Sequence, residues 1–344
     1  MKLCANKFAS RKKSTKVDKN RLPSTLVDFF RLLSILLLLP AAHAAVDGTW
    51  VKHTTAPRNY SDILNWSPDI ARGAGATATF NPRSSYATFQ ILLDESPTLG
   101  QLLFTANGGA RIFNSNAVHT ITFDNGRENS RVTIPCERAS VHIDVPLILA
   151  NNTTLAVSKS VTITRANETR FTQPVTGRGD ISVSMSGVSP KDENRCVLRF
   201  EAPIHISGGI AMQGTPTQFT RAEYLVLAAA NTYPGGTRVF SGILNARAPG
   251  SLGTGDIVVG AFGELRLDAS AATHPRASLA LFSATHDGRP ARARVNLGPT
   301  PATTNTVATL LVNGARQPPG FYTAPSHEAT QPFFAGLGVL KVEK

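Results

Sequence analysis

YLVLAAANTYPGGTRVFSGILNARAPGSLGTGDIVVGAFGELRLD, residues 224–268, is the stretch that decides the fold class. Short apolar runs of strand length, rich in β-branched residues, alternate in it with corners made of Gly and Asn. The glycines and Asn231 tolerate the positive φ angles that sharp corners need. The stretch therefore predicts several short strands separated by tight corners.

A Gly-x-Leu tripeptide occurs twice in this stretch, at residues 242–244 and again at residues 263–265. The offset between the two copies, 263 − 242, is a plausible length for one coil of a solenoid. We predict that Leu244 and Leu265 occupy equivalent inward positions on adjacent parallel strands. Strand alternation should turn the charged residues on either side of Leu265 outward, toward solvent.

The same stretch resembles the autotransporter-associated β-strand repeat of secreted bacterial proteins. The motif residues of that repeat fall on Asn231, Thr232, Tyr233, Gly235, Gly236, Thr237, Gly242 and Leu244, and Gly263 and Leu265 repeat the last two. The copy is divergent, and it departs from the family at Ala228, Ala229, Pro234 and Arg238. The resemblance implies a right-handed parallel β-helix and export from a bacterial cell. It implies no particular activity, since many family members have none assigned.

The composition also favours an all-β chain. Charged residues make up 17% of the sequence, apolar residues make up 42%, and there are 27 glycines. The predicted fold is an all-β, right-handed parallel β-helix (β-solenoid) with an N-terminal β cap. Residues 45–118 are predicted to form the cap and the first coils, and residues 119–344 the β-helix, whose clearest repeat is at 224–268. Asn313-Gly314, between β-rich runs, predicts a hairpin.

Residues 1–44 have the three parts of a secretory signal. Nine Lys or Arg residues occur in the first 31 positions, an apolar run follows at 32–39, and Ala42-His43-Ala44 provides an Ala-x-Ala cleavage site. We expect the mature chain to begin near Ala45 and to keep no stable membrane span. The alternative is a retained anchor, although the apolar run is shorter than the ~20 residues that span a bilayer.

Removing this signal changes what the charge implies. The chain has 35 basic and 23 acidic residues, and the signal takes 9 and 2 of them, so the mature part carries 26 − 21 = +5. No dense stripe of Lys, Arg and aromatic residues remains, so nucleic-acid binding is not expected. The resemblance places the mature protein in the periplasm, at the cell surface or in the medium of a Gram-negative-type bacterium.

Both tryptophans of the chain, Trp50 and Trp66, lie in the first mature segment. A terminal coil of a solenoid exposes apolar residues unless something covers them, so a structural cap is the favoured interpretation. The alternative is a sugar-stacking platform, in which the two indole rings would contact a glycan.

Two cysteines remain after the signal, Cys136 and Cys196. Their separation along the chain, 196 − 136, is close to three times the Gly-x-Leu offset. Three steps of ~4.8 Å would separate them by ~14 Å. A disulfide needs Cα atoms within about 7 Å, so two buried free thiols are expected unless the loop at 190–195 brings the cysteines together.

No catalytic, metal-binding or cofactor-binding motif stands out, so no cofactor is expected. Arg178-Gly179-Asp180 is an Arg-Gly-Asp tripeptide, for which a charged solenoid corner is the simpler explanation than an adhesive role. The nearest candidates for a polysaccharide lyase or hydrolase site are Asp180, Asp192, Glu193 and Arg195. Solvated loop charge explains them as well, and function must be argued from a site rather than from a fold.

The favoured function is therefore a structural or adhesive protein, exported and without chemistry of its own, resembling an autotransporter passenger without its barrel. Its partner would be a surface glycan or the surface of a host or neighbouring cell. The alternatives are a carbohydrate-active β-helix enzyme and a glycan-binding module.

Overall fold

The computed structural model describes residues 44–344 except 53, 82–87, 106–107, 117, 136–139, 159–166, 187–195, 215–222, 287 and 325–332. The regular structure of these residues consists of β-strands, apart from a single 3-10 turn, η1 (Ile63–Asn65). In this part of the chain no helix has the length and apolar character to cross a membrane. His43–Lys344 form one unit by internal contacts. The prediction of an all-β chain is confirmed.

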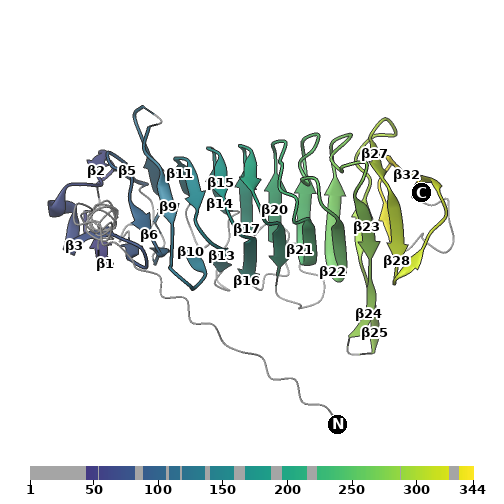
Figure 1. The fold of residues 1–344 in the computed structure, drawn as a ribbon, viewed down its shortest axis with the longest axis horizontal. Coiled ribbons are helices and arrows are strands. Elements are labelled where there is room, and N and C mark those ends of the chain that lie inside the picture. The colour runs from purple at the N-terminus through teal and green to yellow at the C-terminus, as the bar shows by residue number, and fades with distance from the viewer. Residues whose placement is uncertain are drawn as a thin grey trace, which may run out of the picture. The chain divides into compact units, whose positions relative to one another are not determined.

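Most strands belong to three long parallel ladders (Figure 1). The first ladder contains β1 (Val46–Trp50), β4 (Thr77–Phe80), β7 (Gln101–Phe104), β10 (Ser130–Pro135), β13 (Thr153–Ser158), β16 (Ile181–Ser186), β19 (Ile210–Gln213), the first halves of β21 (Thr237–Ala246) and β22 (Ile257–Leu267), β23 (Ser278–Leu281) and β28 (Thr309–Val312).

The second ladder contains β2 (Arg58–Asn59), β5 (Phe89–Leu92), β8 (Ala110–Phe113), β11 (Val141–Asp144), β14 (Asn167–Phe171), β17 (Cys196–Phe200), β20 (Glu223–Leu227), the second halves of β21 and β22, β26 (Arg294–Asn296) and β31 (Phe334–Ala335). The third ladder contains β6 (Thr98–Leu99), β9 (Ile121–Phe123), β12 (Leu147–Leu149), β15 (Val175–Gly177) and β18 (Ile204–Ile206).

The chain visits these ladders in a fixed order. From β10 to β18 successive strands belong to the first, second and third ladder, three times over. One step along the first ladder takes the chain from Ser130 to Thr153, and the next step, from Thr153 to Ile181, is longer. The Gly-x-Leu offset is found between Leu244 and Leu265, which are register partners on parallel strands, as predicted. The number of residues in one step along a ladder is therefore not constant, because the connections between strands differ in length.

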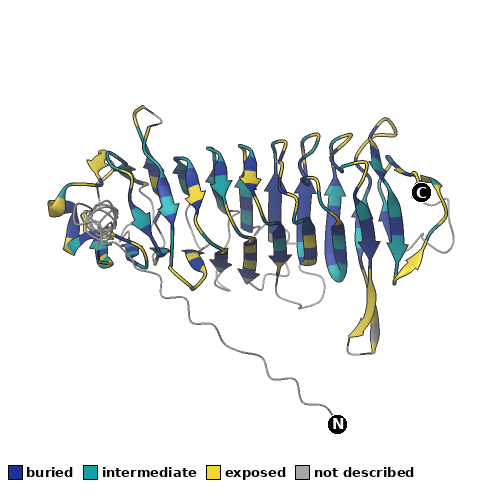
Figure 2. Cartoon of the chain, in the orientation of Figure 1, coloured by how far each residue is buried: buried dark blue, intermediate teal, exposed yellow. Residues whose placement is uncertain are grey.

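Inward side chains of successive strands stack into apolar columns. Leu225, Leu244, Leu265 and Val295 are consecutive register partners, and each is fully buried. Dark blue positions along every ladder in Figure 2 mark the same alternation of buried and more exposed residues. The inward placement of Leu244 and Leu265 is thus as predicted.

The outward neighbours of Leu265 are less exposed than predicted. Glu264 is only 8% exposed, and its Oε1 lies 2.7 Å from Nε of Arg266. The guanidinium of Arg266 lies 5.3 Å from the centre of the Tyr224 ring. Glu264 is buried because bulky side chains occupy the same position on the strands before it. Its register partner on β21 is Ile243, and the register partner of Ile243 on β20 is Tyr224.

Asn231 of the repeat motif bonds to the backbone of two other segments of the chain. Its Oδ1 accepts from Ile204 N at 2.8 Å, and its Nδ2 donates to Ser251 O at 2.5 Å. The side chain is only 6% exposed, so these bonds are shielded from water. Asn305 repeats the arrangement further along, accepting from Ala272 N at 2.8 Å. The motif asparagine therefore satisfies backbone groups that a sharp corner leaves without a strand partner.

Tyr233 and Thr237 of the same motif are also structural. Tyr233 is fully buried, and its hydroxyl lies 2.8 Å from Thr237 Oγ1. Thr237 Oγ1 donates to Leu252 O at 3.0 Å. Burial raises the pKa of the Tyr233 hydroxyl, so it remains a neutral hydrogen-bonding group.

The N-terminal segment closes the core with aromatic rings. Trp50 and Trp66 are 2% and 5% exposed and meet edge to face with centroids 5.2 Å apart. Tyr60 and Phe80 pack on Trp66 at 4.9 Å and 5.5 Å. β3 (Trp66–Arg72) holds Trp66 opposite Trp50 by pairing antiparallel with β1. Neither indole presents an open face, so the arrangement fits a cap and does not support a sugar-stacking role for these two side chains.

Cys196 is disulfide-bonded, so the expectation of a free thiol there is wrong. Its partner is Cys4 or Cys136, the other two cysteines of the chain, and both lie outside the described residues. The expectation assumed that every step is as short as the Gly-x-Leu offset. The steps near Cys196 are longer, since Cys196 lies opposite Asn167 on the second ladder and Thr169 lies opposite Val141. The assumed step length was therefore wrong for this part of the chain.

The C-terminal part adds short antiparallel elements. β24 (Ser283–His286) and β25 (Arg289–Arg292) form a hairpin, and β28 pairs with β29 (Ala315–Arg316) through the predicted turn at Asn313-Gly314, whose φ angles are 50° and 80°. The last sheet joins β27 (Thr304–Val307), β32 (Val339–Val342) and β30 (Gly320–Tyr322).

Leu265→Ala should lower the free energy of unfolding by ~2–5 kcal/mol, because it removes a fully buried side chain and leaves a cavity between the coils on either side. Urea unfolding followed by tryptophan fluorescence measures this. Leu64→Ala is the matched control, since Leu64 is 72% exposed and should change stability by less than about 0.5 kcal/mol. Equal effects of the two substitutions would contradict the inward placement of Leu265.

Asn231→Ala should destabilise the protein by about 2–5 kcal/mol, because in a buried corner Ile204 N–H loses its partner and Ser251 C=O keeps only the longer bond from the Tyr233 hydroxyl, at 3.4 Å. Asn129→Ala, at an exposed position, is the comparison. Thermal melts of the two variants that coincide would show that the asparagine bonds contribute nothing.

Candidate functional site: a charged face on the second ladder

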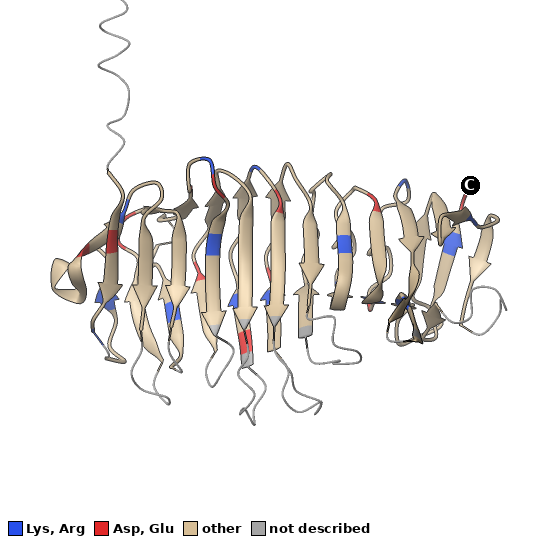
Figure 3. Ribbon diagram, turned by 90° about the horizontal axis from the view of Figure 1, so that it is seen from below, with Lys and Arg blue, Asp and Glu red and all other residues tan. Residues whose placement is uncertain are grey.

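Charged residues are sparse along the strands, as the mostly tan ribbon in Figure 3 shows, so the places where several meet are informative. One such place is the outer face of the second ladder. Arg111, His142, Arg170 and Arg199 are consecutive register partners on β8, β11, β14 and β17. Like charges on neighbouring strands repel one another at this spacing, so the column requires acidic partners.

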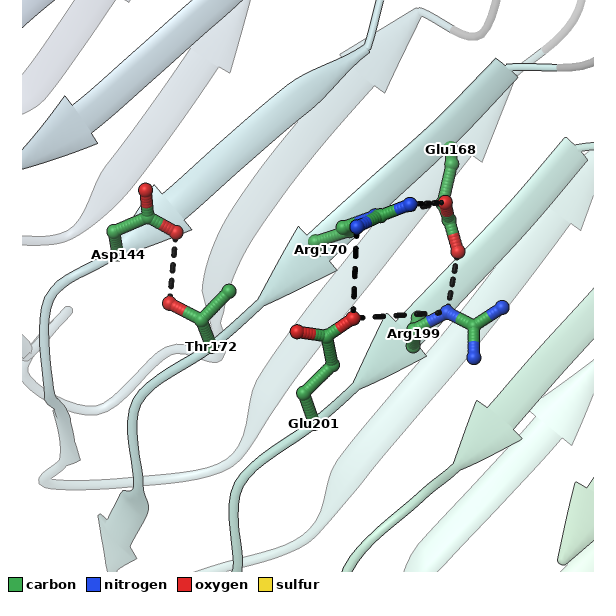
Figure 4. Close-up of polar contacts among 6 residues, drawn as sticks. All are labelled: Asp144, Glu168, Arg170, Thr172, Arg199 and Glu201. Atoms are coloured by element: carbon green, nitrogen blue, oxygen red, sulfur yellow. Dashed lines mark hydrogen bonds and ion pairs between the residues drawn. The ribbon is translucent and has the colours of Figure 1, made fainter. Parts of the chain in front are cut away.

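Glu168 and Glu201 supply the partners of the two central arginines (Figure 4). Glu168 Oε2 lies 2.6 Å from Nη2 of Arg170, and Glu168 Oε1 accepts a hydrogen bond from Nε of Arg199 on the next strand. Glu201 Oε1 lies 3.8 Å from Nη1 of Arg170 and 4.0 Å from Nε of Arg199. Two carboxylates and two guanidinium groups therefore alternate around one closed cluster.

Asp144 extends the network to two more strands. Its Oδ2 accepts from Nε of Arg111 at 2.6 Å, and its Oδ1 accepts from Oγ1 of Thr172 at 2.7 Å. The Arg111 guanidinium also lies 5.0 Å from the centre of the Phe113 ring. The second ladder is thus cross-linked on its outer face from β8 to β17.

The protonation state of Glu168 indicates what the cluster can do. Partial burial alone would raise its pKa, but hydrogen bonds from Arg199 and Arg170 outweigh burial and hold the pKa below the ordinary value. Glu168 is therefore a carboxylate throughout the neutral range. A general acid for glycosidic cleavage needs a raised pKa instead, so the cluster is suited to hold strands together rather than to donate protons.

A second pair of carboxylates, Asp94 and Glu95, follows β5. Burial raises the pKa of Glu95, and the neighbouring charge of Asp94 adds to this effect. Asp94 accepts from Ser61 N at 2.9 Å and from Ser61 Oγ at 2.6 Å. Glycosidic chemistry places two carboxyl groups about 5–10 Å apart across a bound sugar. Asp94 and Glu95 are chain neighbours, and Asp94 is occupied in tying the Ser61 turn to β5.

One small void lies in the interior between the three ladders, and it is too small for a ligand. That void has a volume of about 10 Å³ and is lined by Phe123, Leu147, Leu149, Thr153, Leu155, Phe171, Val175, Ile181 and Phe200. Its walls come from all three ladders and are almost wholly apolar, so it is a packing gap of about one water molecule.

The Arg-Gly-Asp tripeptide lies at a corner between the third and first ladders. Asp180 Oδ1 accepts from Gly209 N at 2.7 Å, and Asp180 N donates to Asn152 Oδ1 at 2.9 Å. Gly179 has φ of 83°, and a Cβ at Gly208 would collide with its backbone. Arg178 and Asp180 are exposed, yet the aspartate already bonds to the corner before β19.

The other enzyme candidates, Asp192, Glu193 and Arg195, lie outside the described residues. Within the described ranges no group of three or more His, Cys, Asp or Glu residues is arranged to hold a metal ion.

The motif glycines Gly235 and Gly236 lie against the neighbouring glycine corner. Thr232 is exposed, and its Oγ1 lies 2.7 Å from His205 Nδ1. Gly242 has φ of 84° and pairs with Gly263, so these motif residues are all part of the scaffold.

The glutamate–arginine cluster was not found from the sequence. Its signal is a pair of opposite tripeptides, Glu168-x-Arg170 and Arg199-x-Glu201, whose arginines are register partners on adjacent strands. The Gly-x-Leu offset is shorter than the separation of Arg170 and Arg199 along the chain, so it does not predict that these two arginines are register partners. Comparison of the chain with protein-family models, curated proteins and solved structures finds no match.

The Glu168 cluster predicts how stability depends on pH. Because the folded-state pKa of Glu168 is lowered, its stabilisation is complete above the unfolded carboxyl pKa of about 4.3 and is lost as the pH falls through the lower folded-state value. Urea midpoints measured from about pH 6 down to about pH 3 should fall less steeply for Glu168→Gln than for wild type. The exposed Glu128→Gln is the control, and a Glu168→Gln curve parallel to wild type would contradict the assignment.

Proposed function

We propose that this chain is an exported β-solenoid with a structural or adhesive role at the cell surface, in the periplasm or in the medium. The observation that carries the proposal is the cyclic order of the three ladders from β10 to β18. A chain that returns to the same ladder every third strand winds around a common axis, which makes each cycle one coil. Strand–crossover–parallel strand connections are right-handed in about 98% of cases, so the coil is a right-handed parallel β-helix.

The use of polar residues supports a scaffold rather than an enzyme. Asn231, Tyr233 and Thr237 spend their hydrogen bonds on backbone or on each other, and the Glu168 cluster is internally neutralised. These residues hold coils in register. The same motif carries the resemblance to the autotransporter-associated β-strand repeat, and we propose that the chain is a divergent relative of such passengers, with residues 45–118 as cap and residues 119–344 as β-helix.

Export is supported by two features of the chain. Residues 1–44 have the form of a secretory signal, and Cys196 is oxidised in a disulfide. Disulfides form and persist in the periplasm and outside the cell and are rare in the cytosol. A surface or secreted location also fits a protein whose proposed partner is a glycan or another cell surface.

The alternative function is a carbohydrate-active enzyme, and an assay must distinguish it from a scaffold. Purified protein tested against a panel of polysaccharides, with binding and cleavage scored together, decides between them. Binding without new reducing or unsaturated ends is the expected result. Turnover of any polysaccharide that is lost on Glu95→Gln would overturn the scaffold proposal, because Glu95 is the described carboxyl group with a raised pKa.

Expression in a Gram-negative host should yield a mature chain that begins near Ala45 and carries no reactive thiol, because the two remaining cysteines are expected to be joined to each other. Intact-mass spectrometry measures both, with thiol alkylation before and after reduction. Full-length chain in the inner membrane would show that residues 32–39 act as an anchor. Two alkylated cysteines before reduction would contradict the pairing.

A further inference from the structure

An exposed pair of phenylalanines lies where the first ladder passes into the second. Phe240 on β21 and Phe282, directly after β23, are 46% and 41% exposed. The residues before them, Val239 and Leu281, are fully buried, so strand alternation turns both rings outward.

A bulge in β22 lies between the two phenylalanines. Val239, Val259 and Leu281 are successive register partners on β21, β22 and β23, but Ser241 then pairs with Phe262, so Gly260 and Ala261 together lie opposite Phe240. Phe282 N donates to Val259 O at 3.0 Å, which fixes Phe282 on the far side of this glycine. A Cβ placed on Gly260 would meet the Phe240 backbone at 3.0 Å, so the glycine lets the two strands approach closely at the bulge.

The two phenylalanines lie on the strands on either side of this bulge. Two strand spacings separate the backbones of Phe240 and Phe282 by about 9.6 Å. A ring-shaped group in contact on both of its faces needs about 7–8 Å, twice the optimal distance between carbon atoms. Phenyl side chains that stand upright at this spacing would admit a single sugar ring above the bulge. This feature is named the aromatic slot.

The β24–β25 hairpin borders the slot. It projects from the strands in Figure 1 and is yellow, that is exposed, in Figure 2. His286 of the hairpin packs edge to face on Phe262 of β22, with ring centroids 5.5 Å apart. Ser283, which follows Phe282, is the register partner of Arg292, so this arginine belongs to the base of the hairpin beside the slot.

Positive charge beside the slot has no internal partner. Arg238 precedes Phe240 by two positions on the same strand face, and both Arg238 and Arg292 are exposed. In the part of the chain that the structure describes, neither guanidinium takes part in an ion pair. They differ in this from Arg170 and Arg199, which are neutralised by Glu168 and Glu201.

The position of the slot limits what binds there. β21 and β22 are paired with neighbouring strands on both sides, so their backbone groups are occupied and a peptide cannot add as a new strand. Recognition must come from side chains alone. Aromatic faces take the apolar C–H face of a sugar, and guanidinium groups take carboxylates.

We propose that the aromatic slot, with Arg238 and Arg292, binds an acidic polysaccharide built of uronic acids. One sugar ring lies between Phe240 and Phe282, and carboxylates of that sugar and its neighbours pair with the two arginines. The inference deepens the proposed function, and it rests on it only for the extracellular setting in which such polymers occur.

Calorimetric titration of the purified mature chain with oligogalacturonate, alginate oligomers and hyaluronate oligomers tests the proposal. At least one should bind, with an affinity that falls as salt rises. Phe240→Ala with Phe282→Ala should weaken that binding about tenfold or more, as truncation of aromatic anchors does. Arg238→Gln should weaken it and flatten its salt dependence.

Two controls match these variants. Phe321→Ala removes a phenyl group that is 65% exposed on β30, and Arg131→Gln removes an arginine from the column of Arg238, four steps away along the first ladder. Both should bind like wild type. Thermal melts of all variants should coincide, since every altered side chain is exposed.

Several results would overturn the proposal. They are the absence of binding to all three polymers, equal binding by the double phenylalanine variant, and equal binding of methyl-esterified oligogalacturonate. Equal binding of polyglutamate would assign the patch to acidic peptides instead. Because binding is measured on purified protein, failure here is distinct from failure of export, which the N-terminus of the secreted chain reports.

Discussion

The hydrogen bonds between successive parallel strands, which set a step of about 4.8 Å, are the interaction on which the rest of the structure depends. Each strand must offer its whole edge to the strand before it and the strand after it. The corners must therefore stack as well, although they lack a regular ladder of their own. Asn231 and Asn305 meet this requirement with side-chain amides that bond to backbone in other coils.

The same step decides how charge is arranged. Residues at one strand position recur in the next coil at contact distance, so any column of arginines needs an equal column of acids. Arg170 and Arg199 meet this demand through Glu168 and Glu201. Arg238 does not, because its register partners Ala211 and Val258 carry no charge. Arg131 on the same ladder also has uncharged register partners, Gln101 and Thr154, so it is the exposed phenyl rings beside Arg238 that set this arginine apart.

Several features could be predicted from the sequence because they depend on neighbouring residues. The hairpin at Asn313-Gly314 follows from the turn preference of that dipeptide, and the burial of Leu244 and Leu265 follows from strand alternation. The burial of Glu264 could not be predicted, since it depends on Tyr224 and Ile243 in other coils.

The step length was the main obstacle to predicting the rest. The repeat on which the predictions relied, the Gly-x-Leu pair, implies a shorter step than the one that makes Asn167 and Cys196 register partners. Without the longer step the Glu168 cluster could not be derived. The aromatic slot was missed for the same reason, because Phe240, Gly260 and Phe282 come together only when the register of three strands is known.

Distances between site-specific spin labels test the proposed coil stacking most directly. Along the first ladder Ser182 and Leu311 are five steps apart, and Thr77 and Leu311 are nine steps apart. Labels introduced as noncanonical amino acids should therefore give about 24 Å for the first pair and about 43 Å for the second. A distance for Thr77 and Leu311 equal to or shorter than that for Ser182 and Leu311 would contradict a solenoid of stacked coils.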